Sequence, residues 1–162
     1  MIRRIYRKEQ KCARSRAHKI LNDVNKDLKG EYRFYWRLVG SGAWGTMIKD
    51  ASGEYDLDYQ ILLSSKSSAY NKNTKSFSLP ATINNDFVRA FTGHKTDHET
   101  VENSTTAITL SNNELQPFHI DFVIINPMAN PNQIIRRNNK IESISVNEFT
   151  WNELPKRHET YD

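Results

Sequence analysis

Asp56 and Asp58 are the residues whose types and spacing most directly suggest chemistry. They lie two positions apart at the start of a segment, 56–63, that we predict to be a strand. Because side chains alternate between the two faces of a strand, both carboxylates project from one face, about 7 Å apart, and Leu57 and Tyr59 begin the opposite, buried face. Two neighbouring carboxylates repel each other, and a fold tolerates this when a cation lies between them. The alternative is a solvent-exposed pair at a strand end.

A third aspartate, Asp121, lies within the apolar run 118–125. An ionised carboxylate is costly to bury without a partner. Its position is explained if it points from a neighbouring strand at the same metals as Asp56 and Asp58. The alternative is a buried acceptor whose hydrogen bonds are satisfied by other groups.

A glycine-rich turn, 40–46, precedes the two paired aspartates. Glycines such as Gly40 let a backbone approach a ligand closely, and the amide groups at a helix start favour an anion. Ser41 and Thr46 add hydroxyl groups suited to phosphate oxygens. The turn lacks the Gly-Lys-Ser/Thr of P-loop enzymes and the third glycine of the dinucleotide-binding fingerprint. Hairpins and helix starts use the same residue types, so the turn predicts a phosphate site only together with the aspartates.

The elements that must position these residues follow from hydrophobic spacing and from turn residues. We expect helices over 3–28 and 80–91 (the second closed by Gly93), a short helix from the turn through Ile48, and strands over 32–39, 56–63, 101–110 and 117–125, with a hairpin loop at 111–114. Beyond residue 126 we expect loops and a short hairpin around 134–144. This order predicts an α/β (α+β) domain with a mixed sheet and helices packed on one side.

Composition limits the class of protein. The chain of 162 residues suits one domain, divided into an N-terminal helix (1–30), a core (32–126) and an irregular C-terminal extension (127–162). No apolar run approaches the roughly 20 residues that span a bilayer, so we expect no membrane insertion. Cys12 is the one cysteine, which excludes an intramolecular disulfide and favours a reducing cytoplasm. The net charge of +4, concentrated near the N-terminus, suits either phosphate binding or a solvated helix face.

Histidines and aromatic residues offer weaker signals. His94 and His98 are four positions apart, but they follow Gly93 in a polar stretch, so we expect a loop and not a metal pair. His119 shares a face with Asp121 and is interpreted as a hydrogen-bonded strand residue, with a place near the metals as the alternative. The alternating aromatic residues of 32–36 are expected in the core and not in a base-stacking surface.

Taken together, these motifs resemble the nucleotidyltransferase superfamily related to DNA polymerase β. The resemblance rests on Gly40-Ser41 with Gly45-Thr46, on the Asp-x-Asp strand, and on the distant aspartate in its apolar run, and it covers residues 32–126. More narrowly, three stretches look like bacterial cyclic-oligonucleotide synthases, which are relatives of oligoadenylate synthase and cyclic GMP-AMP synthase. These stretches are the glycine-rich turn, residues 55–58, and residues 106–110 leading to 119–122.

The resemblance implies a role for each motif. The glycine–serine pair would hold a nucleoside triphosphate, with Thr46 in support. Asp56 and Asp58 would ligate two Mg²⁺ ions, which Mn²⁺ could replace. Asp121 would ligate the catalytic metal and help to deprotonate the attacking hydroxyl. This agrees with two-metal chemistry, in which one ion activates the nucleophile and the other stabilises the leaving group.

The activity implied is synthesis of a cyclic or linear oligonucleotide second messenger, of the kind used in bacterial antiphage signalling. Transfer of a nucleotide to an RNA end or to a protein side chain is one alternative, and a catalytically silent nucleotide-binding module is another. The synthases close over their nucleotides with a C-terminal helical domain, which residues 127–162 do not resemble. We therefore expect a fragment, a minimal member, or a protein whose partner supplies this lid.

Overall fold

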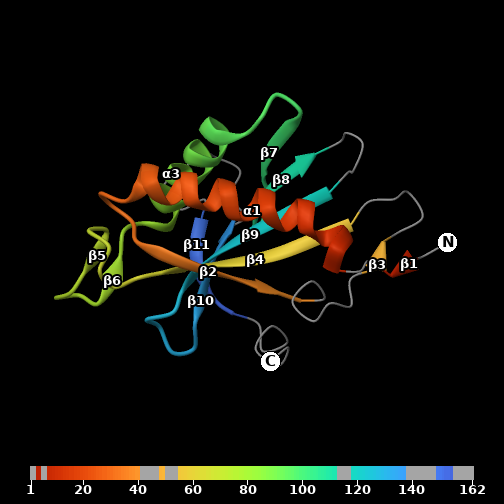
Figure 1. Ribbon diagram of the computed structural model, residues 1–162. Coiled ribbons are helices and arrows are strands. Elements are labelled where there is room, and N and C mark those ends of the chain that lie inside the picture. Colours follow the sequence, from red (N-terminus) through yellow and green to blue (C-terminus); the bar gives the residue numbers. More distant parts are fainter. Residues whose placement is uncertain are drawn as a thin grey trace.

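The computed structural model describes residues 3–4, 7–40, 48–49, 55–112, 118–137 and 149–154. Two helices, α1 (Arg7–Leu28) and α3 (Pro80–His94), lie over one face of a mixed sheet (Figure 1). The strands of this sheet are β2 (Phe34–Val39), β4 (Tyr55–Leu63), β7 (Glu99–Asn103), β8 (Ile108–Asn112), β9 (Phe118–Asn126), β10 (Gln133–Arg137) and β11 (Phe149–Glu153). The predicted fold class is confirmed.

The sheet is ordered around β9. Along one path the strands follow the order β11-β10-β9-β4-β2, while β8 pairs with the first half of β9 and carries β7 on its outer side. Strands β4 and β9 are parallel, and the other pairings in this sheet are antiparallel. The two strands that carry the aspartates are therefore direct neighbours in the interior of the sheet.

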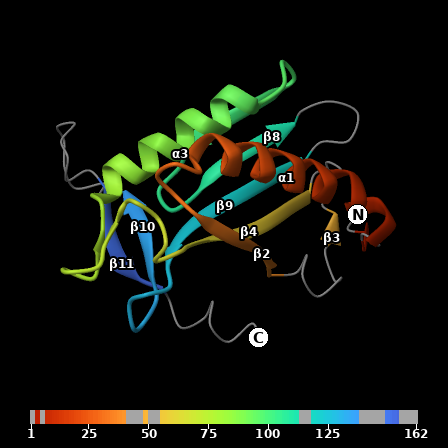
Figure 2. The ribbon, with the colours of Figure 1, turned by 60° about the vertical axis from the view of Figure 1, so that its left-hand side comes forward.

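The helices bury the side of the sheet opposite to the aspartates. Figure 2 shows α1 and α3 side by side across β9, β4 and β2. Residues at three- and four-residue spacing on α1, including Ile20 and Leu21, are fully buried, and Phe91 of α3 lies against Phe122 of β9 with ring centroids 4.6 Å apart. On β4, Leu57 and the residues that alternate with it are fully buried, as the strand periodicity predicts.

Several element boundaries differ from those expected. Helix α1 begins at Arg7, because residues 3–4 form a short strand, β1 (Arg3–Arg4), with β3 (Ile48–Lys49). The expected helix through Ile48 is therefore wrong at that residue, and residues 41–47 lie outside the described part. Helix α3 runs past Gly93 to His94.

The expected strand 101–110 is two strands, β7 and β8, that pair as a hairpin. The polar residues between them form the turn, in which the Ser104 N–H donates to the Ala107 carbonyl at 2.9 Å. A second short hairpin, β5 (Tyr70–Asn71) with β6 (Ser76–Phe77), lies within the expected loop 64–80.

The C-terminal region is more regular than the irregular extension that we expected. Strand β10 pairs with β9 and with β11, so residues 133–137 and 149–153 extend the main sheet. Ile134 and Leu154 belong to a small apolar cluster with Leu62 and Ile125. These strands are short and widely separated in sequence, which hides their periodicity. No described helix is long and apolar enough to cross a membrane.

Candidate active site

Asp58 and Asp121 meet on the open face of the sheet. They occupy directly opposed positions on the parallel strands β4 and β9, and their carboxyl groups interact electrostatically. Val39 of β2 lies opposite Asp58, and Thr109 of β8 lies opposite Asp121. The strand order thus brings together two carboxylates that are far apart in sequence.

The surroundings of Asp58 disfavour its charged form. Burial, followed by the charges of Asp121 and Asp56 and the hydrogen bond that the protonated Asp58 carboxyl donates to Asp121, raises the pKa of the Asp58 carboxyl to about 6. A hydrogen bond between two carboxyl groups requires a proton on one of them. As pH rises through about 6 the pair loses this proton, and a cation bound between the two carboxylates would offset the negative charge that remains.

Asp56 lies on the same face as this pair but is exposed. Its position in the register is opposite His119, two residue pairs from Asp58 and Asp121. Among the described residues, no three His, Cys, Asp or Glu side chains are grouped so that they could hold a metal ion as they stand. The Asp58–Asp121 pair nevertheless fits Mg²⁺, which is bound through one or two carboxylates and completes its shell with water and substrate phosphates.

Gly40, the first residue of the glycine-rich turn, lies close to Asp58. Its φ of +71° lies in the left-handed region, which glycine adopts without strain. A Cβ atom at this position would lie 3.3 Å from Oδ2 of Asp58. The chain therefore enters the turn in close contact with the acidic pair. Ser41 and Thr46 lie outside the described residues.

Solved structures share this arrangement of elements. The structure matches the CD-NTase CdnG of Bradyrhizobium diazoefficiens in complex with GTP, with a TM-score of 0.65 at 15% identity over 93% of this chain. The chain has the nucleotidyltransferase fold. It also matches DncV of Vibrio cholerae, described as a cyclic AMP-GMP synthase, in complex with the linear intermediate 5′ pppA(3′,5′)pG (TM-score 0.51, 12% identity, 78% of this chain).

A further DncV structure, the form bound to 3′-deoxy ATP, gives a TM-score of 0.51 at 14% identity over 94% of this chain. The chain spans 40%, 31% and 39% of the length of these three structures. No protein-family model and no curated protein matches the sequence. The similarity is therefore one of fold, with the acidic pair placed on the open face of the nucleotidyltransferase sheet.

Outside the acidic pair, the histidines have structural partners. His119 Nδ1 lies 2.7 Å from Ser111 Oγ on β8, in agreement with its interpretation as a hydrogen-bonded strand residue. His94 is the last residue of α3 and not part of a loop, and its Nε2 lies 2.6 Å from Asp27 Oδ2. His94 therefore connects the end of α3 to α1.

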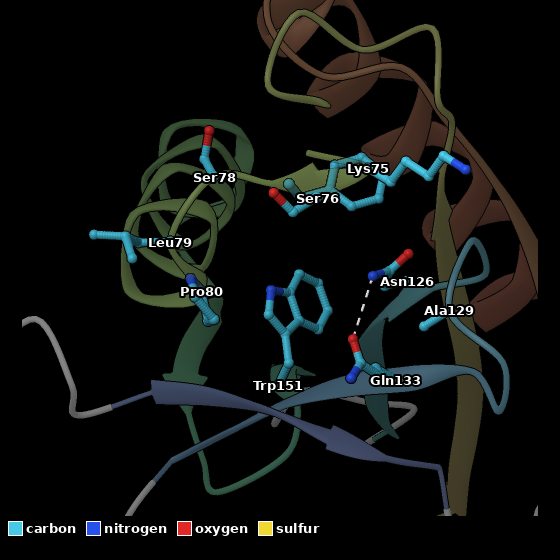
Figure 3. A pocket seen from close by; sticks show the side chains of 10 residues that line it. Lys75, Ser76, Ser78, Leu79, Pro80, Asn126, Ala129, Gln133 and Trp151 are labelled. Atoms are coloured by element: carbon cyan, nitrogen blue, oxygen red, sulfur yellow. Dashed lines mark hydrogen bonds between the residues drawn. The ribbon is translucent and has the colours of Figure 1, made fainter. Parts of the chain in front are cut away.

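A cavity of about 250 Å³ lies away from the acidic pair, among β6, the start of α3, β10 and β11 (Figure 3). Trp151 and Pro80 contribute to its apolar wall. Its buried amide, Asn126, donates to Gln133 at 3.3 Å and accepts the Met128 N–H at 3.0 Å. Since Asn126 follows Asp121 by five residues on β9, about 16 Å, the cavity is separate from the acidic pair of the nucleotidyltransferase fold.

One residue of the site was missed by the sequence analysis. Thr109 donates a hydrogen bond from its hydroxyl to Oδ1 of Asp121 at 2.5 Å. The expected strand 101–110 contained Thr109, but its partner depends on the antiparallel register of β8 with β9. Alternation of polar and apolar residues in 108–112 indicates which face Thr109 occupies, and it carries no information about the residue opposite.

Proposed function

We propose that this chain is the catalytic part of a metal-dependent nucleotidyltransferase that uses nucleoside triphosphates to make a cyclic or linear oligonucleotide. The observation that carries the proposal is the Asp58–Asp121 pair, which lies in contact with the residue that opens the glycine-rich turn. Two partly buried acidic residues beside a potential phosphate-binding turn suit a site where a divalent cation meets a triphosphate.

In this proposal the glycine-rich turn binds the triphosphate, and the carboxylates hold the metal ions that activate the attacking hydroxyl. Gly40 allows close approach of the backbone, and Ser41 and Thr46 donate to the phosphates. Asp56, Asp58 and Asp121 would hold Mg²⁺ or Mn²⁺, with Asp121 also helping to remove the proton of the attacking hydroxyl. Bound Mg²⁺ supplies Lewis-acid stabilisation of the attacking and leaving oxygens.

The fold neighbours support the choice of substrate and product. CdnG was solved with GTP, and DncV with 3′-deoxy ATP and with a linear dinucleotide intermediate. We further propose that an additional part, a domain or a partner, closes over the bound nucleotides. Base preference and acceptor choice would depend on that additional part.

The proposal is tested by incubating the protein with labelled ATP and GTP and with Mg²⁺ or Mn²⁺. Small soluble oligonucleotides are expected. Label retained on added RNA or on protein would favour the alternative acceptors, and saturable triphosphate binding without any product would favour a silent binding module.

The matched variants are Asp58→Asn and Asp97→Asn. Asp58→Asn should lower turnover about a thousandfold or more, since loss of a metal-binding carboxylate removes several kcal/mol of transition-state stabilisation. Asp97 is exposed in the turn after α3, so Asp97→Asn should retain the wild-type rate. Equal turnover in wild type and in Asp58→Asn would overturn the assignment.

A further inference from the structure

A hydroxyl group on β8 holds one member of the acidic pair. Thr109 Oγ1 donates to Oδ1 of Asp121 at 2.5 Å, and the two residues are directly opposed in the antiparallel register of β8 and β9. We propose that Thr109 is a positioning residue for Asp121, fixing the plane of its carboxylate relative to Asp58 for a divalent cation. This inference rests on the proposed function.

The contact has the geometry of a strong hydrogen bond. An O–H···O⁻ distance of 2.5–2.7 Å is typical of a hydroxyl that donates to an ionised carboxylate. The terminal torsion of an aspartate is broad, so its carboxylate turns readily unless a neighbour holds it. Threonine suits this task, because its branched Cβ restricts χ1 and so limits where the hydroxyl can point.

The placement on two paired strands adds to the rigidity. Directly opposed side chains have Cβ atoms about 4.5–5.5 Å apart, so a short side chain such as threonine reaches the carboxylate without a flexible stem. In this hydrogen bond the proton stays on the Thr109 hydroxyl, so Asp121 acts as an acceptor and is not neutralised. Thr109 thus fixes the carboxylate and keeps its charge, which are the two properties that a metal ligand requires.

Loss of the hydroxyl should weaken the cation site selectively. Removing a residue that hydrogen-bonds to a metal ligand typically lowers metal affinity or activity by about 10–100-fold. Thr109→Val keeps the branched shape and removes the donor, while Thr109→Ser keeps the donor. Ser111→Ala is the matched control, because Ser111 lies on the same face of β8 and bonds to His119 and not to a carboxylate of the pair.

The experiment measures Mn²⁺ affinity by calorimetry in the presence of a non-hydrolysable nucleoside triphosphate, and it measures kcat and KM separately. For Thr109→Val we expect Mn²⁺ affinity and kcat to fall by about 10–100-fold. KM for the triphosphate should change little, because the turn binds the phosphates. Thr109→Ser and Ser111→Ala should stay within about threefold of wild type, which is far below the loss expected from a missing outer-sphere bond.

The outcomes separate the inference from the function on which it rests. If wild type binds no Mn²⁺ and makes no product, the proposed function fails and the inference fails with it. If wild type binds Mn²⁺ and Thr109→Val binds it equally well, Thr109 has no positioning role while the proposed function stands. If Thr109→Val does not fold, Thr109→Ala, which removes the same hydroxyl and adds no branched apolar group, is judged by the same criteria.

Discussion

Glu99 and Asp58 are acidic residues on strands of one sheet, and they differ in the groups placed around them. Glu99 is only 2% exposed, and both of its oxygens accept from Arg16, each at 2.8 Å. Burial alone would raise the pKa of the Glu99 carboxyl, but the hydrogen bonds from Arg16 and from the Thr96 N–H outweigh it, so the pKa lies below its usual value.

Burial also disfavours the charged form of Asp58, but here the pKa of the carboxyl ends above its usual value. Burial and the neighbouring carboxylates raise the pKa of its carboxyl to about 6. Within the described residues, neither Asp58 nor Asp121 forms an ion pair with a lysine or an arginine. Among the residues that the structure describes, Arg16 neutralises the acid that connects α1 to the sheet, whereas the acidic pair on the open face has no such partner, as expected of a site for an external cation.

Removing the cation from the Glu99 site should have the largest effect on stability. Arg16→Met leaves a buried carboxylate unpaired, so we expect a loss of about 3–5 kcal/mol in the free energy of unfolding. Denaturant unfolding measures this loss. Replacing both partners, as Arg16→Met with Glu99→Leu, should restore most of it. A single variant as stable as wild type would remove the contrast between the two sites.

Gly40→Ala should have an intermediate effect, confined to the acidic pair. The positive φ costs a residue with a Cβ about 1–2 kcal/mol, and the 3.3 Å approach to Asp58 adds to this cost. We expect lower stability together with weaker triphosphate binding, read from thermal unfolding and from a binding titration.

Gly93→Ala is the matched control for this substitution. A Cβ at Gly93, within α3, meets nothing within 4 Å, and alanine is favoured over glycine in a helix by up to about 1 kcal/mol. The two glycine substitutions should therefore change stability in opposite directions. A gain in stability for Gly40→Ala would contradict the close approach of the turn to the pair.

The raised pKa of Asp58 predicts the smallest effect, a stability that falls as pH rises. Its usual value is 3.8 and its folded value is about 6, so between these the folded protein holds a proton that the unfolded chain releases. The contribution of this group is complete below about pH 4 and is lost as pH rises through 6, amounting to about 1–2 kcal/mol after allowance for solvent screening.

Asp58→Asn should remove this pH dependence. In metal-free solution at pH 7 the variant should be more stable than wild type by about 1–2 kcal/mol, because it no longer places a charge beside Asp121. Denaturant unfolding from about pH 4 to 8, with a chelator present, measures the difference between the two curves. If the two curves of unfolding free energy against pH were parallel, the pKa of Asp58 would not be raised in the folded protein.

The sequence predicts the acidic pair because strand alternation is a local property. The spacing of Asp56 and Asp58 sets their common face, and the apolar flanks of Asp121 indicate a buried strand beside them. The structure brings Asp58 and Asp121 together and leaves Asp56 exposed two residues before Asp58, a difference that depends on the register between strands.

The partners of Glu99 and Asp121 could not be predicted in the same way. Arg16 and Glu99 are 83 residues apart, and they meet only because α1 packs beside α3 above the sheet. Thr109 lies on β8, which begins after the turn that divides the expected strand 101–110. It reaches Asp121 because β8 pairs with β9. Contacts of this kind depend on register and on helix packing, which periodicity within one segment does not encode.

The central claim, that the Asp58–Asp121 pair is a site for an external divalent cation, is tested most directly by ligand-dependent unfolding. Wild type, Arg16→Met and the double variant Asp58→Asn/Asp121→Asn are unfolded with and without Mn²⁺ and a non-hydrolysable triphosphate. At about 100 times the dissociation constant, wild type and Arg16→Met should each gain about 2.7 kcal/mol, and the double variant should gain nothing. An equal gain in the double variant, or no gain in wild type, would contradict the account.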